Sequence, residues 1–255
     1  MTKIIAVTNQ KGGVGKTTTS VKLAASLAAS KRKVLLIDLD PQGNAAMGCG
    51  IDKSNVAYSS CDLLLEDMPV SEMIIPVPEF EFDVIAGNSD LTVAEVQLMK
   101  MTQRERRLAN ALQQIQGEYD YILIDCPPSL NMLTLNAMVA ANSVLVPMQC
   151  EYYALEGLSA LMDTLRNIQE TANPTLYLEG ILRTMYDNRS RLTKDVSEQL
   201  VEYFADKVFR TCVPRNIRLA EAPSHGMPVL QYDRSSRGAV AYIALAGELI
   251  RKENK

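Results

Sequence analysis

Short apolar runs that do not alternate with polar residues recur along the 255-residue chain. They cover residues 4–8, 34–38, 121–125 and 143–147, and they are rich in β-branched side chains. Strands of a parallel sheet have this pattern, because helices cover both faces of such a sheet and leave no solvent-facing side. The runs therefore predict buried parallel strands.

Amphipathic stretches of helical periodicity separate these runs, at residues 17–30, 91–115, 130–141 and 154–171. Two further strand candidates, residues 176–185 and 208–213, flank a helical stretch at 193–205, and a last helix is expected over 237–251. Strands and helices that alternate from end to end predict an α/β fold with a doubly wound, mostly parallel sheet flanked by helices.

No Gly/Ser linker or change of composition divides the chain, so residues 1–255 are expected to form a single domain. Residues 49–90, which contain three prolines, are the least regular part and are expected to elaborate one edge of the sheet. The composition, 47% hydrophobic and 22% charged, is that of an ordinary globular protein and excludes a disordered chain.

The five cysteines form no CxxC pair, which favours a reducing cytosol over a secreted, disulfide-bonded fold. The first residues lack the apolar segment of a signal peptide, and every apolar stretch is shorter than the ~20 residues of a membrane span. A cytoplasmic protein is therefore expected.

A glycine-rich loop follows the first apolar run and precedes an amphipathic helix; residues 10–19 read QKGGVGKTTT. A strand, a glycine loop, Lys-Thr and a helix form the context of a P-loop, in which backbone N–H groups surround phosphate oxygens. Lys16 would reach the β- and γ-phosphates, and the Thr17 hydroxyl would ligate Mg²⁺. The nucleotide-binding candidates are Lys11, Gly12, Gly13, Val14, Gly15, Lys16, Thr17 and Thr18.

Aspartates occupy the ends of two other predicted strands. Asp38 and Asp40 lie in the run LLIDLDPQGN, and Asp125 ends the apolar run ILID as a Walker B aspartate does. Asp125 would hold Mg²⁺ through water. No His or Glu stands beside these residues as a strong general base, so catalysis would rest on positioning and electrostatic stabilisation. His225 is interpreted as a loop residue.

The loop departs from the standard GxxxxGK[ST] pattern, because position 10 is glutamine and a second lysine, Lys11, follows it. It resembles the deviant Walker-A loop of the ParA/MinD/nitrogenase-iron-protein superfamily. The resemblance implies that Lys11 reaches across an ATP-sandwich homodimer to the partner's nucleotide. It also implies that Asp38 lies near the metal and the attacking water, and that Asp40 is needed for hydrolysis.

The segment VPRNIRLAEAPSHG at 213–226 resembles the chromosomal ParA (Soj-type) partition ATPases, supported by LRTMYDN at 182–188. The resemblance covers essentially the whole chain and implies that Pro214 and Asn216 contact the adenine. It further implies an ATPase whose ATP-bound dimer binds double-stranded DNA without sequence preference. A ParB-like centromere-binding protein would stimulate its slow hydrolysis, and the dimer would associate with the nucleoid to segregate a chromosome or plasmid. Because the chain begins at the P-loop strand, no N-terminal helix-turn-helix domain is expected.

Charge is distributed unevenly over a chain whose net charge is −4. Residues 181–255 carry 13 basic and 9 acidic groups, whereas residues 1–180 carry 13 basic and 21 acidic groups. A polyanion would therefore bind the C-terminal third. The DNA-binding candidates are Arg189, Arg191 and Arg218, which follow two predicted strands and could form one patch. The alternative is that they are solvated or pair with Asp187, Asp195 and Glu221.

Three other functions must be weighed. A MinD-like positioning ATPase would end in a membrane-binding helix, but residues 239–255 contain no Phe or Trp, so no stable membrane anchor is expected. A nitrogenase-iron-protein-like reductase would need paired cysteine ligands, which the sequence lacks. A P-loop metabolic synthetase would need a second substrate pocket, for which the sequence offers no support.

Overall fold

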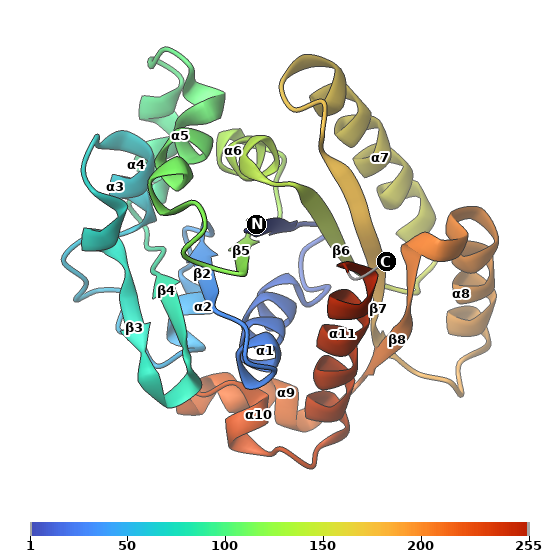
Figure 1. Ribbon diagram of the computed structural model, residues 1–255. Helices are drawn as coiled ribbons and strands as arrows, with labels where there is room; N and C mark the ends of the chain where they lie inside the picture. The colour runs from blue at the N-terminus through green and yellow to red at the C-terminus, as the bar shows by residue number, and fades with distance from the viewer. Residues whose placement is uncertain (1, 254–255) are drawn as a thin grey trace.

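A computed structural model describes residues 2–253. Its centre is an eight-stranded sheet with the strand order β3-β4-β2-β5-β1-β6-β7-β8 (Figure 1). Adjacent strands run parallel except β3, which pairs antiparallel with β4. The strands are β1 (Lys3–Val7), β2 (Val34–Asp38), β3 (Ile75–Val77), β4 (Phe82–Ile85), β5 (Tyr121–Asp125), β6 (Ser143–Gln149), β7 (Tyr177–Tyr186) and β8 (Val208–Pro214). The predicted mostly parallel α/β sheet is confirmed.

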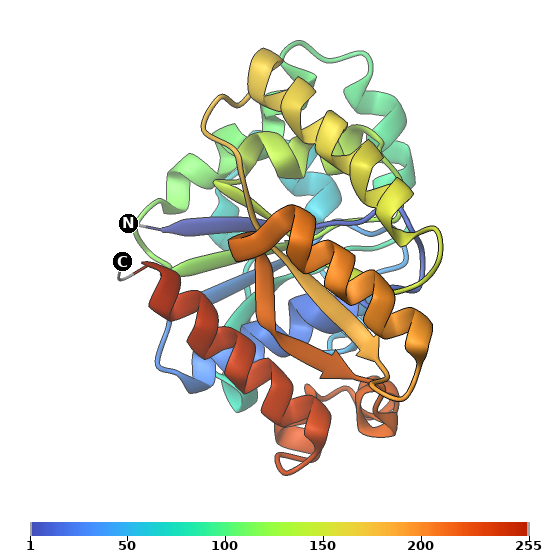
Figure 2. The ribbon, with the colours of Figure 1, turned by 90° about the vertical axis from the view of Figure 1, so that its right-hand side faces the viewer.

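Helices cover both faces of this sheet (Figures 1 and 2). They are α1 (Lys16–Ala29), α2 (Asn44–Met47), α3 (Ser60–Leu65), α4 (Leu91–Leu98), α5 (Arg107–Leu112), α6 (Met132–Ala140), α7 (Ala154–Thr171), α8 (Arg191–Phe204), α9 (Ile217–Glu221), α10 (Val229–Tyr232) and α11 (Arg237–Glu253). Short 3₁₀ turns span Val70–Met73, Pro78–Phe80, Arg104–Arg106, Gln113–Ile115, Ala205–Lys207 and Ala222–His225.

Two apolar cores lie on opposite sides of the sheet. One contains buried side chains of α1 and α11, and the other contains those of α3 to α8. Every residue of β2 and of β5 is buried, which explains why these runs are apolar without alternation. Their only charged residues are the aspartates at their carboxyl ends.

The stretch predicted as one helix over 91–115 is interrupted. Helix α4 ends at Leu98, and Gln103 adopts a φ of 51° before the next turn begins. The Arg104 guanidinium donates to the Met99 carbonyl at 3.0 Å, so a side chain satisfies a backbone acceptor at the end of α4. Residues 49–90 do build one edge of the sheet, although the sequence pattern does not predict β4.

The C-terminal helix α11 packs against α1 and β8. Its last described residue, Glu253, accepts a hydrogen bond from Tyr121 at 2.6 Å and pairs with Lys3 at 3.3 Å. Residues 254 and 255, which belong to the segment judged a poor membrane anchor, lie outside the described part. Among residues 2–253, no helix has the length and hydropathy that crossing a membrane requires.

Two glycines give matched tests of packing. A Cβ on Gly180 of β7 would lie 2.6 Å from the Phe209 ring and 3.0 Å from the Lys207 carbonyl oxygen, whereas a Cβ on Gly157 of α7 would meet nothing within 4 Å. We expect Gly180→Ala to lower the free energy of unfolding by about 1–3 kcal/mol through overpacking. Gly157→Ala should raise it by about 0.5–1 kcal/mol through helix propensity. Denaturant unfolding of both variants checks this, and equal effects would contradict the assigned packing.

Candidate nucleotide-binding site

The glycine-rich loop connects β1 to α1 at the carboxyl edge of the sheet. Gly13 and Gly15 have φ values of 74° and 89°, a left-handed conformation that favours glycine. The loop is anchored from β7, because the Thr184 hydroxyl donates to the buried Val14 carbonyl at 2.8 Å. Gly12 and Gly13 are exposed, so their backbone remains accessible to a ligand. A loop of this kind at a helix N-terminus is suited to binding phosphate.

Lys16 begins α1 and is largely buried. Its ammonium donates to the Lys11 carbonyl at 3.0 Å, across the turn of the loop. Burial lowers the pKa of Lys16, and the nearby carboxylates of Asp125 and Asp40 oppose that change. The structure therefore brings Lys16 and these two predicted site residues into one electrostatic environment.

Asp125 supplies a free buried oxygen beside the loop. Its Oδ1 accepts a hydrogen bond from Ser20 at 2.8 Å, while its buried Oδ2 has no hydrogen-bond partner within residues 2–253. Burial and the Asp38 charge raise the pKa of Asp125, and the nearby hydroxyl groups of Thr17 and Ser20 oppose the rise. An orphaned carboxylate oxygen next to a threonine hydroxyl is a donor set that suits Mg²⁺.

Asp38 lies opposite Asp125 in the register of β2 and β5 and is fully buried. Its carboxylate accepts backbone hydrogen bonds from Asp40 at 3.1 Å, Ala45 at 2.9 Å and Ala46 at 3.1 Å. The last two come from the first turn of α2, so Asp38 holds this short helix. Burial raises the pKa of Asp38. The two predicted metal-site carboxylates thus lie on adjacent strands, but both oxygens of Asp38 already accept hydrogen bonds from backbone N–H groups.

Asp40 and Lys11 lie nearer the surface. Asp40 accepts a hydrogen bond from the Gln42 backbone at 2.9 Å, and this contact orders the turn before α2. The Lys11 ammonium pairs with Glu151 at 2.5 Å, and about half of each side chain is exposed. Glu151 follows β6 and precedes α7, so the pair connects the loop to a distant part of the chain.

Several residues that shape this site were not predicted from the sequence. Gly87 follows β4, and a Cβ there would lie 2.6 Å from the Asp38 carbonyl oxygen and 3.1 Å from its Cγ. Only glycine lets this segment pass so close to Asp38. Ser20, Thr184 and Glu151 each contact a predicted site residue across a large sequence separation. For these residues, the only signal in the local sequence was Gly87, a glycine that follows an apolar run.

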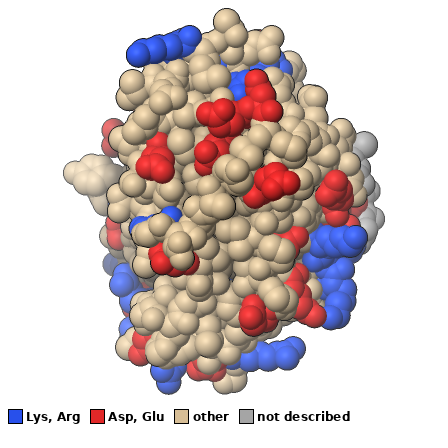
Figure 3. All heavy atoms as spheres, turned by 90° about the vertical axis from the view of Figure 1, so that its left-hand side faces the viewer, with Lys and Arg blue, Asp and Glu red and all other residues tan. Residues whose placement is uncertain are grey.

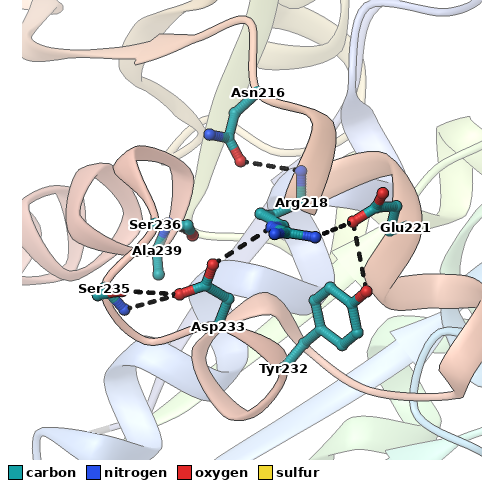
Figure 4. A network of polar contacts seen from close by, with 8 residues as sticks. All are labelled: Asn216, Arg218, Glu221, Tyr232, Asp233, Ser235, Ser236 and Ala239. Carbon is teal, nitrogen blue, oxygen red and sulfur yellow. Dashed lines mark hydrogen bonds and ion pairs between the residues drawn. The ribbon is translucent and has the colours of Figure 1, made fainter.

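The predicted adenine-contacting residues lie on the segment after β8. Pro214 ends that strand and lines a surface cavity of about 860 Å³. The Asn216 side chain accepts a hydrogen bond from the Arg218 backbone at 3.1 Å and thereby caps α9 (Figure 4). In this conformation, one of the two predicted residues is thus engaged in capping a helix.

The three predicted DNA-binding arginines follow β7 and β8, and each of them faces a carboxylate. Arg189 forms two hydrogen bonds of 3.0 Å with Asp187 and lowers the pKa of that aspartate to about 2. Arg191 lies 3.9 Å from Asp195. Arg218 pairs with Glu221 at 2.7 Å and with Asp233 at 3.3 Å (Figure 4). The pairs with Asp187, Asp195 and Glu221 are the ones that the alternative interpretation named, and the contact with Asp233 is additional.

Comparison with known proteins gives full-length relatives. The family described as an AAA domain matches residues 2–178. A protein of Bacillus subtilis named sporulation initiation inhibitor protein Soj is 52% identical, with 98% of each chain covered. The chromosome partitioning protein ParA of Myxococcus xanthus is 50% identical, with 98% of this chain and 89% of that protein covered.

Solved structures agree with the fold along the whole chain. Cobyrinic acid a,c-diamide synthase from Mycobacterium smegmatis, solved with an ATP analogue and magnesium, has a TM-score of 0.87 and 36% identity, covering 100% of this chain and 97% of its own. The septum site-determining protein MinD from Pyrococcus horikoshii, complexed with Mg-ADP, has a TM-score of 0.80 and 26% identity, covering 98% and 96%. The sequence and structural matches thus agree with the deviant loop and the site around it, and the chain belongs to the ParA/Soj family of chromosome-partitioning ATPases.

Proposed function

We propose that the chain is an ATP-dependent DNA-partitioning switch that hydrolyses ATP with Mg²⁺. The observation that carries the ATP and Mg²⁺ part of the proposal is the buried, unpartnered Oδ2 of Asp125, which lies beside the P-loop threonine at the start of α1. Homologous structures hold an ATP analogue with magnesium and Mg-ADP. ATP and Mg²⁺ are accordingly the cofactors of this site.

The residues of the site divide the work of phosphoryl transfer. The loop backbone and Lys16 would bind the phosphates, while Thr17 and Asp125 would hold the metal. Bound Mg²⁺ supplies charge neutralisation for the phosphate oxygens. Asp40, fixed by its contact with the turn before α2, would orient the attacking water. The expected rate is low until a partner completes the site, because the predicted site residues include no strong general base.

Dimerisation would depend on Lys11. Its ammonium is half exposed and is held by Glu151, so it can exchange that surface ion pair for a phosphate at small cost. A lysine that leaves its own subunit and contacts the partner's nucleotide would make ATP binding and dimerisation one event. The pair with Glu151 supports this proposal because it holds the Lys11 ammonium against a residue outside its own loop.

DNA binding and stimulation by a ParB-like protein complete the proposal, with the ATP-bound homodimer associating with the nucleoid in the cytoplasm. Residues 51–99 carry ten acidic side chains and one basic side chain. On this side of the molecule, acidic side chains spread over the surface and basic ones lie mainly toward its margins (Figure 3). Nucleic acid would therefore approach the opposite side, where α8, β8 and α11 lie (Figure 2).

The two alternatives are represented among the structural neighbours, as a synthase and as MinD. Their identities of 36% and 26% are lower than the 52% and 50% found for Soj and ParA. The full-length match to two partition proteins favours partitioning over small-molecule synthesis. The decisive experiment is ATPase activity with and without nonspecific DNA and a candidate ParB.

Lys16→Gln tests the phosphate site. Loss of the buried ammonium should lower ATP affinity by about 100-fold, the usual scale for losing charge-assisted hydrogen bonds, while the fold survives. Lys31→Gln is the matched control, because Lys31 is an exposed lysine just after the same helix. Calorimetric titration with ATP and Mg²⁺ measures both variants. ATP binding by Lys16→Gln equal to that of wild type would refute the assignment.

Separate variants should uncouple dimerisation from hydrolysis. Asp40→Ala should bind ATP and dimerise but hydrolyse ATP at least 10-fold more slowly, because the residue that orients water is lost. Lys11→Ala should bind ATP and remain monomeric, whereas Glu151→Gln, which keeps Lys11, should dimerise. Size-exclusion chromatography with ATP and Mg²⁺ distinguishes the states. A stable dimer of Lys11→Ala, or a monomeric Asp40→Ala, would show that the roles are wrong.

Arg189→Glu and Arg218→Glu test the predicted DNA residues. If these side chains leave their carboxylate partners to contact phosphates, each substitution should weaken ATP-dependent DNA binding equally for all DNA sequences. Dimerisation should be unaffected. Fluorescence anisotropy with two unrelated duplexes measures the effect. Wild-type affinity in both variants would place the DNA contacts elsewhere.

A further inference from the structure

A second buried lysine lies on α1, the helix that begins with the P-loop Lys16. Lys22 is 1% exposed, and its ammonium donates a hydrogen bond to the Met227 carbonyl at 3.2 Å. Among residues 2–253, no carboxylate forms an ion pair with it, and burial lowers the pKa of Lys22 to about 8. Burying a cation without a carboxylate partner costs folding free energy, so the contact with Met227 calls for a functional explanation.

Three segments meet around the Lys22 ammonium. They are α1 itself, the chain at the end of α2, and the turn that contains Met227 and precedes α10. Gly226 of that turn has a φ of 63°, and a Cβ there would lie 2.8 Å from the Cα of Gly50, so the two backbones are in close contact. Cys49, which precedes Gly50, is buried near Lys22. Burial raises the pKa of the Cys49 thiol to about 12, so it stays neutral and gives the ammonium no counter-charge.

Met227 belongs to a unit formed by residues 216–233, which contains α9 and α10. The Met227 backbone N–H donates to the Ala222 carbonyl at 3.2 Å and closes the turn before α10. Arg218 of α9 pairs with two carboxylates, one of them at the end of α10, and so joins the two helices (Figure 4). Asn216 caps α9 at the start of the unit. The hydrogen bond to Met227 therefore holds a unit whose parts are also connected to one another.

Helix α1 thus connects the two predicted parts of the nucleotide site. Its first turn carries Lys16 and Thr17, the predicted phosphate and metal contacts, and Lys22 lies about 9 Å further along the helix axis. From there the hydrogen bond to Met227 reaches the unit that carries Asn216, a predicted base contact. A nucleotide contacts both parts at once, so the position of the unit relative to α1 decides how well base and phosphates fit. A unit that is already held in place loses less conformational entropy when the base binds.

We propose that Lys22 is a positioning residue for nucleotide binding, whose ammonium connects residues 216–233 to α1 and holds the base-contacting segment at the distance that a nucleotide spans. Lys22 acts through Met227 and not by contact with the nucleotide. This inference rests on the proposed function, because it concerns the binding of ATP at the same site.

Lys22→Met removes the donor and leaves an apolar side chain of similar length in the buried position. The probes are ATP, ADP and inorganic tripolyphosphate, each measured with Mg²⁺ by calorimetric titration. Because tripolyphosphate has no base, it reports only on the loop and the start of α1. Lys22→Met should weaken ATP and ADP binding by about 10-fold, the usual scale for one lost hydrogen bond to a charged group, and leave tripolyphosphate binding unchanged. General damage to the fold would lower the affinity for all three probes.

Two further variants control this result. Lys22→Gln keeps a shorter, neutral donor and should recover part of the lost ATP affinity. Ser26→Ala removes a buried hydroxyl that donates to the Lys22 carbonyl at 2.8 Å, so it disturbs the same helix while the ammonium stays. Ser26→Ala should keep the wild-type ratio of ATP affinity to tripolyphosphate affinity.

The pH profile of the wild-type protein supplies a readout that a merely structural role would not move. The protonated ammonium is the stronger donor, so the ratio of ATP affinity to tripolyphosphate affinity should fall as pH rises through about 8. The ratio is used because the displaced pKa values of Lys16, Asp38 and Asp125 affect the binding of both probes. Cys49 faces the ammonium from the end of α2 and stays protonated over this range, and residues 226–228 of the turn have no titratable side chain.

The outcomes separate this inference from the proposed function. A loss in Lys22→Met that affects ATP and ADP but not tripolyphosphate, together with a pH-dependent ratio in the wild type that becomes flat in the variant, would support it. Equal losses for ATP and tripolyphosphate, no loss for either, or the same pH profile in both proteins would overturn it and leave the ATPase assignment intact. Absence of ATP binding by the wild-type protein would overturn both.

Discussion

The parallel pairing of β2, β5 and β1 at the centre of the sheet is the constraint on which the site depends. In this register Asp38 lies opposite Asp125, and Val7, the last residue of β1, lies opposite Asp125 on the other side. The glycine-rich loop therefore starts beside the two carboxylates. Because helices cover both faces of the sheet, these strands need apolar side chains. The same helices exclude water from the carboxylates at the ends of the strands.

Helix α1 places its first residues beside these carboxylates, where the ligand would bind. Its first turn carries Lys16 and Thr17, while Ser20, one turn on, binds Asp125 from the same helix. The Thr184 contact to Val14 adds a second anchor from β7. The loop is thus held at both sides, and a rigid loop loses less conformational entropy when it binds phosphate.

Features that depend on adjacent residues could be predicted from the sequence, whereas features that depend on contacts between distant segments could not. The buried runs of β2 and β5 and the loop at 10–19 carry their structure in adjacent residues, so fold and phosphate site were predictable. The break after Leu98 and the contact of Glu151 with Lys11 depend on partners far away in the chain. Strand β4 was missed because it is short and ends near Gly87, whose importance is its closeness to Asp38. The local pairs of Arg189, Arg191 and Arg218 could be named from the sequence, because each partner lies within four residues, whereas the contact of Arg218 with Asp233 could not.

The hydrogen bonds that Asp38 accepts from α2 link the catalytic centre to a segment near the surface. A helix of four residues has too few internal hydrogen bonds to persist alone, and two backbone N–H groups of α2 end on this one carboxylate. If Asp38 turns toward a cation beside Asp125, those N–H groups lose their acceptor and the first turn of α2 loosens. The order of the segment from Asp40 to Met47 therefore depends on the direction in which a single buried side chain points. Through this shared anchor, a surface segment could report the state of the catalytic centre without any movement of the sheet.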